Sequence, residues 1–186
     1  MSILKQLQNN KGTVSSALGK ALAEEVIKGN KQILKEAVEL ISYDDKNVRA
    51  GAAKTIEKVA EKKPELVADY LKNLAVAFEM PEPQTRWMII HAYGLCANLN
   101  FEIAKTAFEK AKLYLKNDDS SCLWDRAIVY LGYIGATSSK QSQRVFPVLK
   151  KAFDDVPSQT KTILESFEKM LSILDDKQKD QVLKIA

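Results

Sequence analysis

The chain has 186 residues, of which 46% are hydrophobic and 28% charged, and this balance indicates one globular domain rather than a disordered chain. Seven glycines and five prolines are too few for an all-β fold rich in tight turns, and a net charge of +4 permits an acidic partner without requiring one. The N-terminal stretch has no signal-peptide pattern, and the apolar runs are too short or too interrupted to cross a bilayer. We therefore expect a cytoplasmic protein that does not insert into membranes.

A repeat with a period of 36–38 residues runs along the chain, and its anchor positions are Arg49, Arg86, Trp124 and Thr160. Seven residues after each anchor stand Ile56, Tyr93, Leu131 and Phe167. Apolar side chains also recur four and ten residues after each anchor. Because these offsets mark one face of a helix, the pattern predicts one buried helix in each repeat.

A second helical segment follows each of these, so that every unit is a pair consisting of an A helix and then a B helix. The middle A helices, expected at 85–97 and 122–136, are apolar nearly all round, which is typical of helices packed between neighbours. Gly94 and Gly132 occupy the same place in the repeat, and glycine there predicts close approach of a neighbouring helix. We predict a single domain over 1–186 with about five pairs, at approximately 13–42, 44–79, 81–116, 119–153 and 155–186.

Paired aspartates occur in four places, in the stretches YDDKN, KNDDSS, FDDVPS and LDDKQK. Asp44, Asp119 and Asp155 each lie five residues before an anchor. There we expect them to accept hydrogen bonds from the unpaired amides at the start of an A helix. The fourth pair, Asp175-Asp176, falls in a turn inside the last unit. Because the pairs are spread along stacked units, they cannot converge on one site, and we predict that their role is structural.

Two short motifs resemble the HEAT-repeat signature: D-x-x-x-V-R-x-x-A-A, from Asp44 to Ala53, and L-G-x-I-G, from Leu131 to Gly135. The resemblance covers nearly the whole chain and implies an all-α fold, a right-handed α-solenoid of about five HEAT-like helix pairs. The chain departs from the signature where Trp124 and Thr160 replace arginine and where Pro81 replaces aspartate. HEAT and armadillo proteins are mostly adaptors that bind partners along a concave face of B helices. The resemblance therefore implies a non-enzymatic protein-interaction scaffold.

Motifs for catalysis or cofactor binding are missing from the sequence. The only histidine is His91, in the most apolar helix, where we expect a satisfied core or groove side chain; a single histidine also excludes the usual two- and three-histidine zinc sites. The sequence has no Walker loop and no G-x-G-x-x-G. Cys96 and Cys122 have no C-x-x-C spacing and indicate a reduced, intracellular protein. We therefore predict no cofactor, no metal and no catalytic residue.

Two surfaces are candidates for binding a partner. The B helices change from net negative charge in 65–79 to net positive charge in 101–116 and 140–153. This charge suits an acidic protein partner, although a solvated helix face also explains it. The basic residues that define this candidate are Lys105, Lys110, Lys112, Arg144, Lys150 and Lys151. The other candidate is the edge that carries Trp87 and Trp124, because tryptophan is frequent at binding hot spots, although core packing also explains such residues.

Nucleic-acid binding is the alternative function, since a basic face also suits a phosphate backbone. Bacterial alkylpurine DNA glycosylases of HEAT-like fold use Trp, Asp and Arg in a basic groove, and the residue types of Trp87, Trp124, Asp125 and Arg126 are similar to that set. The sequence contains no longer motif of that family. Excision of alkylated bases is therefore an alternative hypothesis to the scaffold.

Overall fold

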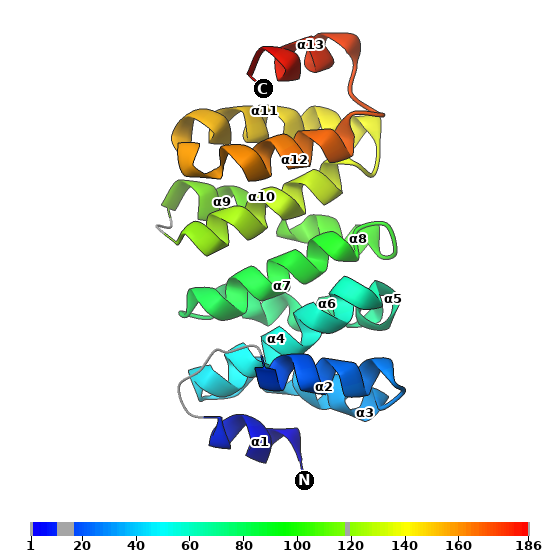
Figure 1. Ribbon diagram of the computed structural model, residues 1–186, viewed down its shortest axis with the longest axis vertical. Coiled ribbons are helices and arrows are strands. Elements are labelled where there is room, and N and C mark those ends of the chain that lie inside the picture. The colour runs from blue at the N-terminus through cyan, green and yellow to red at the C-terminus, as the bar shows by residue number, and fades with distance from the viewer. Residues whose placement is uncertain (1, 11–16, 118–119, 186) are drawn as a thin grey trace.

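The computed structural model describes residues 2–10, 17–117 and 120–185, and all regular elements of these ranges are helices. The helices stack along the long axis of the molecule, from α1 near the N-terminus to α13 at the C-terminus (Figure 1). The α-helices are α1 (Ile3–Asn9), α2 (Ala17–Ile27), α3 (Lys31–Glu39), α4 (Lys46–Lys62), α5 (Pro64–Val67), α6 (Leu71–Leu74), α7 (Pro83–Leu95), α8 (Phe101–Ala104), α9 (Phe108–Asn117), α10 (Ser121–Gly135), α11 (Ser139–Asp155), α12 (Thr160–Met170) and α13 (Asp176–Ile185). The 3-10 segments are η1 (Leu40–Ser42), η2 (Ala68–Tyr70), η3 (Ala75–Glu79), η4 (Lys105–Ala107) and η5 (Pro157–Gln159).

The A helices form a continuous layer, in which α2, α4, α7, α10 and α12 each pack on the next in chain order. The B helices pack on this layer: α3 contacts α2 and α4, α9 contacts α10, and α11 contacts α10 and α12. The short helix α1 packs against α3 and α4 at the N-terminal end of the stack. Contacts thus run from each helix pair to its neighbours, and the predicted all-α solenoid is confirmed.

The repeat positions predicted from the sequence fill the core. Ile56, Tyr93, Leu131 and Phe167 are all 0% exposed. The positions three residues further on, which include Val59 and Cys96, are also fully buried. Full burial of one large apolar side chain stabilises a fold by about 1.5–3 kcal/mol. Because the column continues from one A helix to the next, most of this stabilisation comes from contacts between neighbouring repeats.

Gly94 and Gly132 mark places where adjacent A helices approach closely. A Cβ atom on Gly94 would lie 3.0 Å from the Cα of Tyr130 on α10. A Cβ atom on Gly132 would lie 2.8 Å from the Cβ of Ser166 on α12. Neither position has room for a side chain, so the predicted reason for these glycines is confirmed.

The second and third B helices are interrupted by 3-10 segments, between α5 and α6 and between α8 and α9. At these interruptions buried tyrosines of the A helices donate to backbone carbonyls. The Tyr93 hydroxyl donates to the carbonyl of Leu71, and the Tyr130 hydroxyl donates to the carbonyl of Ala104 at 2.8 Å. Both hydrogen bonds are buried, so they satisfy backbone carbonyls next to the 3-10 segments. The same hydrogen bonds fix each B helix to its A helix.

Arg49 connects the turn before α4 to the start of α7. Its Nη1 donates to the carbonyls of Tyr43 at 2.6 Å and Asp44 at 2.8 Å. Its Nε and Nη2 donate to the two carboxylate oxygens of Glu82, at 2.8 and 2.7 Å. Burial alone would raise the pKa of Glu82, but the hydrogen bonds from Arg49 and Thr85 lower it below its usual value. One side chain therefore joins two successive turns of the solenoid.

The predicted capping role of Asp44 and Asp155 is wrong. Helix α4 is capped by Asp45, whose Oδ1 accepts a hydrogen bond from the Asn47 amide at 2.7 Å, while Asp44 contributes only its carbonyl to Arg49. Asp155 is the last residue of α11 and does not begin the following helix. The reason is that proline at position 157 disfavours helical backbone in the residue before it, so α11 ends ahead of that turn.

The other two aspartate pairs differ from each other. Asp119 lies outside the described residues, and α10 is capped by Ser120, whose Oγ accepts from the Leu123 amide at 3.4 Å. Asp175 caps α13 through a reciprocal pair with Gln178: its Oδ1 accepts from the Gln178 amide at 2.8 Å, and its own amide donates to the Gln178 side chain at 3.2 Å. This arrangement is a capping box and gives the last pair a structural role.

Candidate functional site

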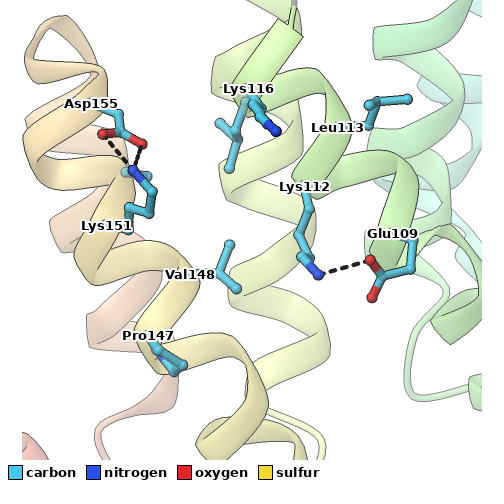
Figure 2. Close-up of a pocket in the computed structure, with 10 residues that line it drawn as sticks. Glu109, Lys112, Leu113, Lys116, Pro147, Val148, Lys151 and Asp155 are labelled. Carbon is cyan, nitrogen blue, oxygen red and sulfur yellow. Dashed lines mark hydrogen bonds and ion pairs between the residues drawn. The ribbon is translucent and has the colours of Figure 1, made fainter.

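A groove with a volume of about 500 Å³ lies between α9 and α11, on the B-helix side of the third and fourth helix pairs. Figure 2 shows that its two walls come from these neighbouring helices. Its apolar lining consists of Leu113, Leu115, Pro147, Val148 and Ala152. Leu113 is 44% exposed, so this apolar surface is open to solvent. Apolar surface of this kind gains free energy when a partner covers it.

Ionic side chains surround the apolar lining: Glu109, Lys112, Lys116, Lys151 and Asp155. The Lys112 ammonium lies 2.8 Å from Glu109, and the Lys151 ammonium lies 2.6 Å from Asp155 (Figure 2). Each of these pairs is formed within one helix and faces solvent, where an ion pair contributes little. Three lysines against two carboxylates leave the rim net positive, and the lysines can exchange their partners for those of a ligand.

Two of the predicted basic residues lie outside this groove and have partners within the chain. The Lys105 ammonium lies 2.5 Å from Glu102 and above the ring of Phe101. The Lys110 ammonium lies 2.6 Å from Glu79, so it connects α9 with η3 of the preceding repeat. Neither residue lines the groove.

Phe108 joins the basic side chains of α9 and α11. The Lys112 ammonium lies 5.6 Å from the centre of its ring, and the Arg144 guanidinium lies 4.6 Å from it. Each such contact is worth about 0.5–1 kcal/mol at an exposed site. Lys150 is exposed and is not part of the groove lining. Of the six predicted basic residues, the structure therefore places Lys112 and Lys151 on the groove.

The tryptophan edge forms a smaller pocket of about 290 Å³, lined by Trp87, Ser121, Cys122, Asp125, Arg126 and Gln159. Trp124 is partly buried against the core and does not belong to this lining. The Asp125 carboxylate already has partners, since Oδ1 accepts from the Thr162 hydroxyl at 2.8 Å and Oδ2 lies 3.5 Å from Nη1 of Arg126. Of the four residues named for base excision, Trp87, Asp125 and Arg126 line this pocket, and Trp124 does not.

His91 makes a buried contact that the sequence pattern did not indicate. Its Nδ1 lies 2.9 Å from Oε1 of Glu57 on the neighbouring helix α4, and Oε2 of Glu57 accepts from the Lys54 ammonium at 2.7 Å. Burial would raise the pKa of Glu57, but the hydrogen bonds from His91 and Lys54 lower it to about 2. Arg126 adds a positive charge nearby, with its Nε 3.7 Å from Oε1 of Glu57. His91 is thus buried with a hydrogen-bond partner, as expected, and its partner is an ionised carboxylate.

The two cysteines have different surroundings. Cys96 is buried, its thiol donates to the Pro64 carbonyl at 3.4 Å, and burial, with the nearby charge of Glu65, raises its pKa to about 12. A thiol with this pKa is protonated at neutral pH and is a poor nucleophile. Cys122 is exposed, and neither cysteine forms a disulfide. The cytoplasmic location expected from the sequence stays a prediction.

Comparison with known proteins shows the fold. No protein-family model matches the sequence, and no curated protein matches it. Among solved structures, a computationally designed armadillo repeat protein for modular peptide recognition matches with a TM-score of 0.65 at 16% identity, over 98% of this chain and 86% of that one. The chain has an armadillo-like helical-repeat fold. This confirms the expected HEAT- or armadillo-like architecture.

Two further solved structures agree with this fold. A second designed armadillo repeat protein matches with a TM-score of 0.62 at 12% identity, over 100% of this chain and 87% of that one. An engineered protein matches with a TM-score of 0.64 at 18% identity, over 99% of this chain and 86% of that one. At these identities the armadillo-like likeness concerns the fold alone. Within the described ranges, no helix combines the length and the apolar character that a membrane span needs.

Proposed function

We propose that this armadillo-like protein is a non-catalytic binding scaffold, and that it holds an acidic peptide segment with apolar side chains in the groove between α9 and α11. The observation that carries the proposal is the combination of an exposed apolar lining with a net positive rim. Apolar side chains of the peptide contact Leu113 and Val148, and its carboxylates pair with Lys112 and Lys151. Both contributions are needed, because exposed ion pairs alone give little affinity.

The rim favours a peptide over a nucleic acid. A phosphate backbone carries closely and regularly spaced charges, and its binding depends on many unshielded cations. Lys112 and Lys151 each stand beside a carboxylate of their own helix, at 2.8 and 2.6 Å, and these carboxylates repel phosphate. A peptide with one or two acidic residues can replace Glu109 and Asp155 as partners of the lysines. This exchange costs less free energy than bringing a whole phosphate backbone next to the same carboxylates. The apolar lining of the groove offers nothing to phosphate or sugar.

The fold supports the same proposal. One structural neighbour was designed for modular peptide recognition, and the neighbours named above are engineered or designed proteins. In an armadillo-like stack, side chains from successive B helices lie on one continuous surface, so a peptide can cross from α9 to α11 without a turn. The groove between these helices combines that surface with open apolar area.

A display library of short peptides tests the proposal. We expect selection on the immobilised protein to enrich sequences that combine Asp or Glu with Leu, Ile, Val or Phe. The affinity of a selected peptide, measured by fluorescence anisotropy, should fall at least tenfold in the double variant Lys112→Glu/Lys151→Glu. It should also fall with added salt, because the rim charges are exposed.

A matched control separates the groove from general charge. Lys150 is an exposed lysine next to Lys151 but outside the groove lining, so Lys150→Glu should change the affinity by less than about twofold. A selected peptide whose binding is unaffected by the double variant, or is weakened equally by Lys150→Glu, would move the binding site away from this groove. Leu113→Ala should weaken binding without any change in its salt dependence.

The excision of alkylated bases is the second candidate function, because Trp87, Asp125 and Arg126 line one pocket. Release of a base from alkylated duplex DNA by the wild-type protein, and loss of this release in Asp125→Asn, would favour this function over the scaffold. We expect no release, because both oxygens of Asp125 already have partners in Thr162 and Arg126.

A further inference from the structure

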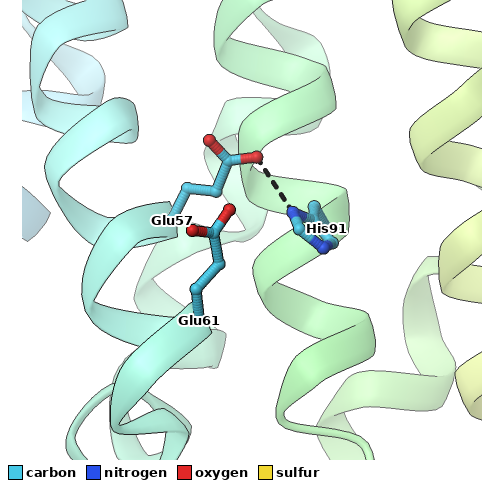
Figure 3. A group of neighbouring side chains, drawn as sticks. All are labelled: Glu57, Glu61 and His91. Carbon is cyan, nitrogen blue, oxygen red and sulfur yellow. Dashed lines mark hydrogen bonds and ion pairs between the residues drawn. The ribbon is translucent and has the colours of Figure 1, made fainter. Parts of the chain in front are cut away.

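Three side chains that can ligate a metal converge between α4 and α7, away from the groove. Glu57 and Glu61 lie on successive turns of α4, and His91 comes from α7 (Figure 3). One ligand atom from each of the three lies within 4.8 Å of the other two. The spacing of four residues places both carboxylates on the same face of α4. The stacking of neighbouring A helices then brings the only histidine of the chain against that face.

The geometry at the buried end of this cluster suits an ion. Glu57 is 1% exposed, and its Oε1 lies 2.9 Å from Nδ1 of His91. The hydrogen bond between them needs a donor, which is the Nδ1–H of the imidazole. When a metal ion binds at Nδ1, the ring proton moves to Nε2, so that the ion is held by one carboxylate oxygen and one nitrogen of a neutral imidazole. The carboxylate of Glu61 points to the same place from the next turn (Figure 3).

The charges around the cluster allow a divalent ion to bind there. Two carboxylates, a neutral imidazole and a dication form a neutral group, which a buried position tolerates. In the structure the two carboxylates are neutralised by lysines of the same helix: Lys54 lies 2.7 Å from Glu57, and Lys58 lies 2.5 Å from Glu61. Both lysines have flexible stems and are partly exposed, so they can turn to solvent at small cost.

Arg126 is a further cation near the cluster. Its Nε lies 3.7 Å from Oε1 of Glu57, which is longer than a hydrogen bond. Its Nη1 lies 3.5 Å from the carboxylate of Asp125, so a second anion is already next to the guanidinium. Arg126 therefore does not depend on Glu57 for a partner.

We propose that Glu57, Glu61 and His91 bind one divalent transition-metal ion, best matched by Zn²⁺, and that solvent completes its coordination. One imidazole nitrogen with carboxylate oxygens is a donor set that zinc accepts in tetrahedral sites, whereas Ca²⁺ and Mg²⁺ take oxygen ligands. The ion would join two neighbouring A helices. The sequence analysis predicted no metal because it considered sets of two or three histidines, and this set has one.

Titration of the metal-stripped full chain with Zn²⁺, followed by isothermal titration calorimetry, tests the proposal. We expect saturable binding of one ion per chain. The variant Glu61→Gln should weaken binding by at least about tenfold, since even indirect changes at metal sites cost 10–100-fold in affinity. Glu61 lies at the surface, so this change should leave the fold intact. The matched control is Glu168→Gln, an exposed glutamate on α12, which should leave the affinity unchanged.

Two further variants make the test specific. Lys58→Ala removes a competitor for Glu61 and should strengthen Zn²⁺ binding by about twofold, the change that corresponds to a weak helix ion pair. With Co²⁺ as the probe, the visible absorption of the bound ion should change in His91→Gln, because the nitrogen ligand is lost. Absence of stoichiometric binding, equal affinity in wild type and Glu61→Gln, unchanged or weaker binding in Lys58→Ala, or a Co²⁺ spectrum unaffected by His91→Gln would each contradict the proposal.

Discussion

Replacement of Arg49 is the perturbation that best tests how successive turns of the solenoid are joined. The side chains of Arg49 and Glu82 are 9% and 10% exposed, and their two charge-assisted hydrogen bonds measure 2.8 and 2.7 Å. Arg49→Ala leaves the Glu82 carboxylate without its main partner and removes the donor of the Tyr43 and Asp44 carbonyls. Loss of one partner from a buried ion pair costs about 3–5 kcal/mol, and we expect the free energy of unfolding to fall by about this amount.

The assay is urea denaturation followed by far-UV circular dichroism, with Arg86→Ala as the matched variant. Arg86 occupies the equivalent place in the next repeat, and its contacts there include a long hydrogen bond of 3.4 Å to the Pro81 carbonyl and the ring of Tyr114. Because these two contacts are weaker than a bidentate ion pair, we expect Arg86→Ala to cost less than Arg49→Ala. Equal costs for the two variants would refute the reasoning, because the cost would then follow the repeat position and not the buried ion pair.

The same pair has a defined pH dependence. In the folded protein the pKa of Glu82 is lowered from its usual value of 4.5. A lowered folded-state pKa contributes stability that is present above the unfolded value and is lost as the pH falls through the folded value. The stability difference between wild type and Arg49→Ala should therefore be constant near neutral pH and shrink below about pH 4.5. A difference that grows on acidification would contradict the assigned direction.

Five further substitutions test the packing and the caps, with the free energy of unfolding as the measurement. Leu131→Ala, in the central column, should cost about 2–5 kcal/mol. Leu183→Ala should cost less than about 0.5 kcal/mol, because the Leu183 side chain in α13 is 76% exposed. Similar costs for the two variants would argue against the solenoid order. Gly132→Ala should cost about 1–3 kcal/mol, because the added Cβ would lie 2.8 Å from a side-chain atom of α12. An unchanged free energy of unfolding would show that the two helices can move apart. Asp45→Ala should cost about 1 kcal/mol, because it removes the cap of α4. Asp155→Ala should cost less, because Asp155 ends α11 and caps no helix start. A larger cost for Asp155→Ala than for Asp45→Ala would support the capping role that the sequence predicted for Asp155.

The helical columns could be predicted from the sequence because burial follows the period of the repeat. Ile56, Tyr93, Leu131 and Phe167 stand at equal offsets from their anchors, and all are fully buried. The glycines at 94 and 132 could be interpreted for the same reason, since they share one place in the repeat. Regular spacing determines which face of each helix meets its neighbours, and the fold follows from that spacing.

The turns were harder to predict, because a cap depends on the backbone conformation of a single residue. Asp44 and Asp45 are chemically the same, and only the extended backbone of Asp45 allows its side chain to reach the Asn47 amide. At Asp155 the decisive signal was Pro157, two residues later, which ends α11. The position of an aspartate in the repeat was therefore a weaker signal than the residues next to it.

The candidate sites could be predicted only in part, since they depend on distances between repeats. The sequence indicated the basic B-helix face, and the groove lies on that face. It did not indicate that Leu113 and Val148 leave an apolar gap between α9 and α11, because periodicity gives the face of a helix and not its distance from the next helix. The contact between Glu57 and His91 joins residues 34 positions apart and was missed for the same reason.

Amide chemical-shift mapping of the ¹⁵N-labelled protein, titrated with a peptide selected from the display library, tests the proposed function most directly. If the groove is the binding site, the largest shift changes will lie in α9 and α11, at residues 108–117 and 145–155, and they will disappear in Lys112→Glu/Lys151→Glu. Shift changes concentrated in α7 and α10 around Trp87 would contradict the proposal and would place the binding site at the tryptophan edge.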